Sequence, residues 1–150
     1  MLLPSVSHFK IRRFKRVEAG EADLQDVNLL IGTNNSGKTS FIQGMHFAIS
    51  VLQSITHQDK WTTAARSTVS FGPSELIYVP TESVYSVAHG AALTQDRATG
   101  FDFTLSNGQE FHVDIRKGKN KNLNVNVWGV VAAGRALGQI QRPYSVFCPG

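Results

Sequence analysis

Apolar positions recur along the chain with two different periods, and each period predicts one kind of element. Residues 41–55 carry apolar side chains at helical spacing on two adjoining faces, so they predict a helix buried against a sheet. Residues 101–105 and 110–115 instead alternate with period two, which predicts two strands. Asn107 and Gly108 lie between these strands, and an Asn-Gly pair in that place indicates a tight hairpin.

The pattern on the N-terminal side of that hairpin gives further elements. Residues 8–17 alternate apolar and basic side chains and predict a strand with a basic exposed face, followed by a polar turn at residues 18–23. Short apolar runs at residues 27–31 and 74–80 predict buried strands, the second ended by Pro80. Residues 61–72 fit neither period.

The C-terminal part of the chain predicts smaller elements. We expect a short helix or loop at residues 88–96, a basic turn at 116–122 and a third antiparallel strand at 123–130. A short helix at 131–141 and a final strand at 144–147 complete the expected order.

Between the expected strand at 27–31 and the expected helix lies the sequence GTNNSGKT, a complete G-x-x-x-x-G-K-[ST] pattern at residues 32–39. A strand, a glycine loop and a helix in this order form the context of a Walker A phosphate-binding loop. The glycines let backbone N–H groups converge on a phosphate, while Lys38 reaches the β- and γ-phosphates and the Thr39 hydroxyl binds Mg²⁺. The predicted nucleotide-binding residues are Gly32, Thr33, Asn34, Asn35, Ser36, Gly37, Lys38, Thr39 and Ser40.

Composition sets the class of protein. A chain of 150 residues with 41% hydrophobic and 17% charged residues is typical of one globular domain. No apolar run approaches the roughly 20 residues that span a membrane. The single Cys148 and the lack of a signal-peptide core favour a cytoplasmic location. The net charge of +4 permits contact with nucleic acid without requiring it.

The loop and the first strand resemble one branch of P-loop proteins. The sequence IGTNNSGKTS is similar to the G-P-N-[GN]-[SA]-G-K-[ST] loop of SMC/RecF-like ABC-type ATPases, including bacterial ATPases related to overcoming-lysogenization-defect nucleases. Thr33 stands where that loop usually has proline. Residues 11–15, IRRFK, resemble the family opening I-x-N-F-K, with Arg13 in place of the Asn, at a position that implies contact with adenine or ribose.

The resemblance implies an α/β fold, namely the N-terminal ATPase lobe of a P-loop NTPase with a mixed sheet, a P-loop helix and an antiparallel β-meander. It also implies ATP and Mg²⁺ as ligands and a second ATPase head, in a homodimer or higher oligomer. DNA, or a nuclease or other effector, would be a further partner. We expect residues 1–150 to form a single nucleotide-binding lobe that is incomplete, and to act as an ATP hydrolase only with the missing lobe and a partner head.

The family's later motifs are not found in the sequence. Residues 105–109, LSNGQ, look like the L-S-G-G-Q signature, but the alternating segment after them favours a hairpin. No acid occurs from residue 124 to 141, and Glu82 is the first acid after the apolar run at 76–79, which we interpret as a core strand rather than a Walker B strand. The catalytic residue is therefore unknown.

Two other functions stay open from the sequence alone. A small P-loop kinase or GTPase is disfavoured because residues 120–123, NKNL, lack the Asp of N-K-x-D and only Arg135 and Arg142 could form a kinase lid. A non-hydrolysing ATP sensor is not distinguished. His46 is expected in packing or at the surface, and no cluster has metal-ligand spacing. The basic side chains form either a solvated face or a nucleic-acid contact: Lys10, Arg12, Arg13, Lys15 and Arg16 in the first strand, and Lys117, Lys119 and Lys121 in the later turn.

Overall fold

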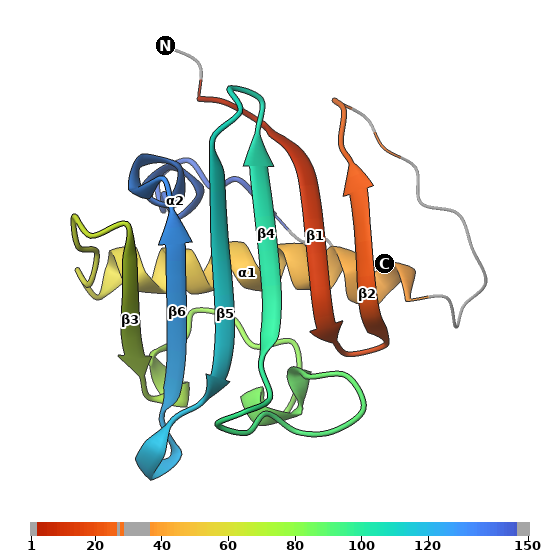
Figure 1. The fold of residues 1–150 in the computed structure, drawn as a ribbon, viewed down its shortest axis with the longest axis vertical. Helices are drawn as coiled ribbons and strands as arrows, with labels where there is room; N and C mark the ends of the chain where they lie inside the picture. Colours follow the sequence, from red (N-terminus) through yellow and green to blue (C-terminus); the bar gives the residue numbers. More distant parts are fainter. Residues whose placement is uncertain (1–2, 27, 29–36, 147–150) are drawn as a thin grey trace.

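The computed structural model describes residues 3–26, 28 and 37–146, which form an antiparallel sheet with a long helix across one face (Figure 1). The strand order is β2-β1-β4-β5-β6-β3, and each neighbouring pair is antiparallel. The strands are β1 (Val6–Phe14), β2 (Val17–Asp23), β3 (Arg66–Phe71), β4 (Thr99–Leu105), β5 (Glu110–Lys117) and β6 (Leu123–Gly129).

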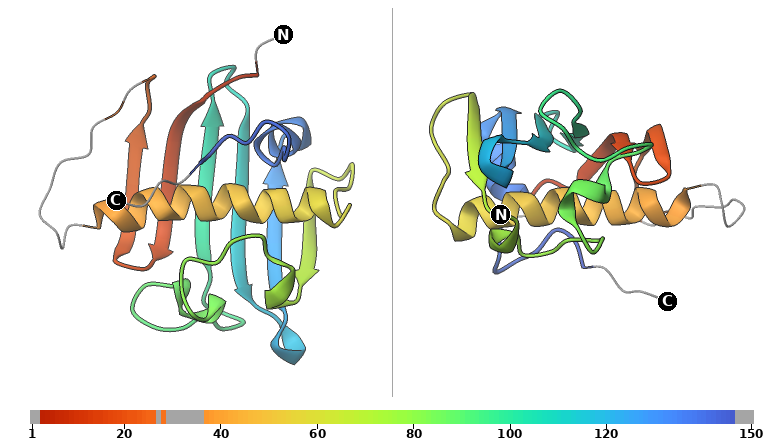
Figure 2. Two further views of the ribbon diagram at one scale, coloured as in Figure 1. Left: turned by 180° about the vertical axis from the view of Figure 1, so that it is seen from behind. Right: turned by 90° about the horizontal axis from the view of Figure 1, so that it is seen from below.

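The helix α1 (Lys38–His57) crosses the strands on one side of the sheet, and the short helix α2 (Val131–Leu137) lies on the same side against β5, β6 and α1 (Figure 2). The expected helix, the hairpin of β4 and β5, the third strand and the short C-terminal helix are therefore confirmed. The sheet is antiparallel throughout the described residues, where a mixed sheet was expected. The strand expected at 27–31 lies outside the described residues except for Asn28, which is in no strand.

The core lies between the sheet and α1, because alternate strand residues point toward the helix. Phe9 and Ile11 of β1 and Phe101 and Phe103 of β4 are fully buried. Gly44 marks the closest approach of helix and sheet, since a Cβ at this position would lie 2.3 Å from Ile11 Cδ1. A glycine in mid-helix costs about 1 kcal/mol in helix propensity, and here it lets α1 settle directly onto β1.

Two polar or irregular segments turned out to be edge strands. Residues 18–23 were expected to form a turn, but they belong to β2, which pairs with β1 from Val17 opposite Phe14 to Asp23 opposite His8. The prediction failed because an edge strand with both faces partly exposed carries polar side chains that resemble a loop. Residues 66–71 fitted no period and form β3, with Val69 and Phe71 turned inward.

Two segments expected to be strands are not. Residues 74–80 form the 3₁₀ turn Pro73–Glu75 and a loop that crosses α1, where the Ile77 backbone N–H donates to Ser54 Oγ at 3.1 Å. The apolar side chains of Leu76, Tyr78 and Val79 pack against the core from outside α1 and not within the sheet. Residues 144–146 likewise belong to no strand, so the pairing expected for the chain end is wrong for these residues.

Candidate functional site

The N-terminus of α1 is the part of the predicted phosphate loop that the structure describes. Gly37 precedes the helix in the left-handed conformation, with φ 86° and ψ 10°, and accepts the first helical hydrogen bond from Phe41 at 2.8 Å. Among the described residues no side chain caps this helix end, and its first turn carries no acid. The first N–H groups of a helix and the positive end of its dipole favour the binding of an anion at such an end.

Lys38, Thr39 and Ser40 form the first turn of α1, and each has a different environment. Lys38 is half-buried, Thr39 is exposed, and Ser40 is buried. The backbone N–H of Arg16 donates to Ser40 Oγ at 3.5 Å, so the serine joins the helix to the turn between β1 and β2. Lys38 and Thr39 thus lie at the helix start, where the sequence predicts that a phosphate and its metal ion bind.

The turn between β1 and β2 is basic and lies beside this helix end. Arg13 and Lys15 both have positive φ, 57° and 48°, a conformation that is uncommon for residues other than glycine. Lys15 Nζ donates to Gln43 Oε1 at 2.6 Å, one turn into α1. A Cβ at Gly37 would lie 3.1 Å from Val17 Cγ2, so the glycine also lets the turn approach closely.

A distant segment holds this strained turn in place. The backbone N–H of Lys15 donates to Val87 O at 2.7 Å, and the backbone N–H of His89 donates to Arg13 O at 3.0 Å. The His89 ring adds a bond from Nδ1 to Lys15 O at 2.8 Å, which fixes the proton on Nδ1. Val87 ends the 3₁₀ turn Val84–Val87, in the long connection between β3 and β4. Local strain of this kind persists only where the surroundings impose it.

The described residues therefore bring together part of the predicted site. Gly37, Lys38, Thr39 and Ser40 lie at the helix start, and the chain segment of Arg13 lies beside it, as the contacts of Arg16 and Lys15 show. The predicted residues Gly32, Thr33, Asn34, Asn35 and Ser36 lie outside the described residues.

Sequence reasoning missed Gln43 and His89 as members of this region. Gln43 follows Thr39 by four positions, so it lies on the same helix face, and that spacing could have indicated it. His89 lies more than seventy residues from the turn it contacts, since it bonds Lys15 at a separation of 74. Nothing in the local sequence indicates such a contact.

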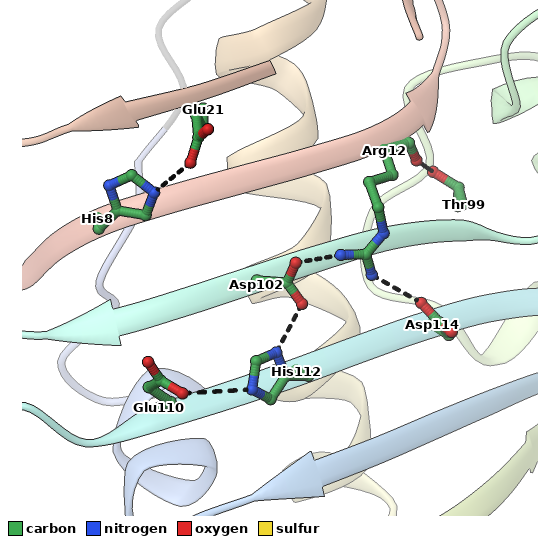
Figure 3. A network of polar contacts seen from close by, with 8 residues as sticks. All are labelled: His8, Arg12, Glu21, Thr99, Asp102, Glu110, His112 and Asp114. Carbon is green, nitrogen blue, oxygen red and sulfur yellow. Dashed lines mark hydrogen bonds and ion pairs between the residues drawn. The ribbon is translucent and has the colours of Figure 1, made fainter. Parts of the chain in front are cut away.

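The opposite face of the sheet carries a separate network of ion pairs (Figure 3). Arg12 bonds the carboxylates of Asp102 and Asp114, the second at 3.3 Å, and His112 Nδ1 donates to Asp102 at 2.6 Å. The ring of Trp128 stacks on His112 with centroids 5.2 Å apart. Because alternate residues of a strand point to opposite faces, these carboxylates lie on the side away from α1. Arg12 thus lies on the face away from the helix, as predicted, but that face is not simply basic there, because Arg12 is paired with two carboxylates.

His46 lies on the outer side of α1, where it joins two loops. Its ring packs edge-on against Tyr78 with centroids 4.8 Å apart, and its Nδ1 hydrogen-bonds Ser145 Oγ at 2.8 Å. Burial lowers the pKa of His46 and raises the pKa of Tyr78. These contacts agree with the expected packing role.

The region 105–109 is a hairpin turn and not a signature motif. Gly108 has φ 83° and donates its N–H to Leu105 O at 2.9 Å, and Leu105 in turn bonds Gln109 O. The residues on either side pair as Thr104 with Glu110 in adjacent strands. The apolar run at 76–79 is no Walker B strand, because it is not a strand.

A left-handed glycine followed by a lysine at the start of a long helix is the form in which a phosphate-binding loop ends. Comparison with protein families gives the class of the chain: the model of the AAA ATPase domain matches residues 5–125. This chain belongs to the AAA ATPase domain family. Membership of this family implies ATP binding and hydrolysis.

No curated protein and no solved structure matches the chain. Among residues 3–26, 28 and 37–146, no helix is both long and apolar enough to cross a membrane. In the same residues no group of three or more His, Cys, Asp and Glu side chains could hold a metal ion.

Proposed function

We propose that this chain binds Mg²⁺-ATP at the N-terminus of α1, as the nucleotide-binding lobe of an SMC/RecF-like ABC-type ATPase head. The observation that carries the proposal is the start of α1. It begins at Lys38 directly after a left-handed Gly37, with no acid in its first turn and no capping side chain in the part of the chain that the structure describes. A helix start of this kind attracts an anion, and the GKTS sequence places the lysine and hydroxyl that phosphates and Mg²⁺ require.

Each residue of the proposed site has a chemical role. The Lys38 ammonium would bind the β- and γ-phosphates, and backbone N–H groups of residues 32–37 would surround the phosphate oxygens. Thr39 is exposed at the first turn, so its hydroxyl fits Mg²⁺, which takes oxygen ligands and keeps several waters. Arg13 lies near the end of β1, next to the turn beside the helix, and we assign it to the adenine or ribose.

The proposal extends to a larger assembly. In an ABC-type head, ATP lies between two heads, and each supplies its phosphate loop against the partner. Engagement and hydrolysis would then drive a DNA-directed or nuclease-linked step. The match to an ATPase family and the basic net charge of +4 support this extension.

Isothermal titration calorimetry with ATP and Mg²⁺ tests the phosphate site. Lys38→Ala should weaken ATP binding at least about tenfold, since a charge-assisted hydrogen bond contributes roughly 1.5–3 kcal/mol. Lys10→Ala is the matched control. Lys10 lies in the middle of β1, opposite Asp102 of β4, and not in the turn beside the helix start. Unchanged affinity in Lys38→Ala, with the control also unchanged, would contradict the proposed site.

Light scattering tests the assembly separately. Mg²⁺-ATP should raise the average mass of the wild-type protein, whereas Lys38→Ala should show no nucleotide-dependent change. Nucleotide binding without any change in mass would leave the phosphate site in place and contradict the partner head.

A further inference from the structure

A polar, basic pocket lies at the turn between β5 and β6. It is at the other half of the sheet from the turn that lies beside the proposed ATP site. The pocket has a volume of about 490 Å³ and is lined by side chains of β3, β5 and β6 and of the loop before β4. The strand order places β5, β6 and β3 on one half of the sheet, while the turn of β1 and β2 lies on the other half (Figure 1). Its lining residues are Ser70, Gln95, Asp96, Arg116, Lys117, Gly118, Lys119, Asn120, Asn122 and Asn124.

The charge of this lining is unbalanced. Arg116, Lys117 and Lys119 are cationic, whereas Asp96 is the one acid among the lining residues. The neutral members are mainly amide and hydroxyl side chains, which donate hydrogen bonds without adding negative charge. A small anion with several oxygen acceptors suits such a lining better than a cation or an apolar ligand.

The charge of Arg116 is only partly compensated by the residues that the structure describes. Within the described residues its Nη1 donates to Gln95 O at 3.2 Å, and its Nη2 lies 3.9 Å from an Asp114 oxygen. Asp114 is shared with Arg12, whose Nη2 is closer at 3.3 Å, so the Arg116 charge is incompletely compensated. Its buried Nε has no hydrogen-bond partner among the described residues. A buried N–H without a partner is costly and uncommon in native proteins.

The backbone holds the turn in a defined shape. Asn120 and Lys121 both have positive φ, 56° and 63°. Gly118 donates to Asn122 O at 2.6 Å, and Asn122 donates to Lys119 O at 3.2 Å. Lys117 Nζ lies 5.3 Å from the centre of the Tyr85 ring, a contact that positions the ammonium without neutralising it. The cations therefore border the pocket in the folded protein before any ligand arrives.

We infer that this pocket is a second anion site, which binds a phosphate group through Arg116, Lys117 and Lys119. An arginine fork and lysine point charges are the usual protein partners of phosphate oxygens. The phosphate belongs either to a small free species or to a nucleic-acid backbone, since both present the same oxygens. The site does not depend on ATP binding at α1.

Nuclear magnetic resonance of the ¹⁵N-labelled chain with inorganic phosphate tests the site residue by residue. We expect saturable shifts in the amide signals of residues 116–124. Lys119→Gln should weaken this binding about fivefold, and Arg116→Gln on the order of tenfold. Lys119 is exposed, so its substitution leaves the fold intact, and thermal unfolding checks the Arg116 variant.

Lys121→Gln is the matched control, because Lys121 lies in the same turn but does not line the pocket. It removes the same charge and should change phosphate affinity about twofold at most. Equal weakening by Lys119→Gln and Lys121→Gln would overturn the site, because it would reveal only general attraction to a basic turn. Phosphate shifts confined to the start of α1 would overturn it as well.

A short DNA duplex distinguishes the two sources of phosphate once inorganic phosphate has bound. If the source is a nucleic-acid backbone, the duplex shifts the same signals. Lys119→Gln then lowers the slope of log affinity against log salt concentration by about 1, the effect of losing one phosphate contact. If the source is a small free phosphate, the duplex leaves residues 116–124 unchanged. Either result supports the pocket and assigns its ligand, whereas the phosphate titration alone can reject it.

Discussion

Lys15 and Gln43 are joined by a hydrogen bond of 2.6 Å from Nζ to Oε1, which connects the turn of β1 and β2 to the second turn of α1. The two residues are 28 positions apart. Through this bond and that of Arg16 with Ser40, a basic turn is fixed beside the proposed phosphate site. The bond therefore gives a direct test of whether the turn contributes to nucleotide binding.

Lys15→Met should weaken ATP binding several-fold, and less than Lys38→Ala. Methionine keeps the length and apolar stem of the side chain but loses the donor, so the turn loses one link to α1. Hydrogen bonds of charged groups contribute roughly 1.5–3 kcal/mol, and only part of this reaches the ligand. Calorimetry measures the effect, with Lys10→Met in β1 as the control. A loss equal to that of Lys38→Ala would mean that Lys15 contacts the phosphates itself.

His89→Ala should loosen the turn at Arg13 and Lys15, because it removes the bond from the ring Nδ1 to Lys15 O. Hydrogen exchange at the amides of residues 13–16 should become faster. The free energy of local opening should fall by about 1 kcal/mol. His89→Asn is the control, since the asparagine amide places a donor near the position of Nδ1. If both variants exchange at the same rate as the wild type, the ring bond does not hold the turn.

Gly44→Ala should destabilise the fold by about 1–3 kcal/mol, because its Cβ would overlap Ile11 Cδ1, which is 2.3 Å away. The gain in helix propensity offsets at most about 1 kcal/mol of this cost. Ile11→Val removes the overlapping atom, so the double variant should recover part of the loss. Chemical denaturation of the single and double variants completes the cycle. Additive losses would mean that the overlap is not the cause.

His8 should stabilise the fold at acidic pH and not at alkaline pH. The hydrogen bond to the Asp23 carboxylate, and secondly that to Glu21, raises the pKa of His8 above the ordinary value of 6.5. A raised folded-state pKa gives stability that is complete below 6.5 and is lost as the pH rises through the raised value. His8→Gln should therefore lower the free energy of unfolding by about 0.2–1 kcal/mol near pH 6.

The same variant should match the wild type near pH 9, roughly two to three units above the ordinary histidine pKa. Thermal unfolding across this range measures the difference. A constant difference at every pH would show that His8 acts through packing and not through its charge.

ATP turnover by residues 1–150 alone should stay well below about 1 per second, the lower end of typical enzyme rates. Phosphoryl transfer requires a group that positions the attacking water. The half-buried carboxylates Asp102 and Asp114 are engaged by Arg12 and lie on the face away from α1. A phosphate-release assay measures turnover. Ordinary enzyme rates would favour a self-contained kinase or GTPase.

The spacing of apolar residues in the sequence was sufficient to predict those elements that are determined by contacts between near neighbours. The apolar stripes of α1 and the Asn107-Gly108 turn between two alternating runs determine their structure through contacts between near neighbours. The GKTS sequence likewise indicated the start of α1 within one residue. These signals are intrinsic to the segment, because side-chain spacing and turn geometry do not depend on the rest of the fold.

Tertiary structure decided the elements whose environment is supplied by distant residues. The polar segment 18–23 forms β2 because it pairs with β1. The apolar segment 76–79 packs over α1, where the Ile77 N–H donates to Ser54 Oγ. The positive φ of Arg13 and Lys15 is imposed by Val87 and His89, more than seventy residues away. Local sequence cannot specify such features, because the free energy that stabilises them comes from contacts that exist only after the chain has folded.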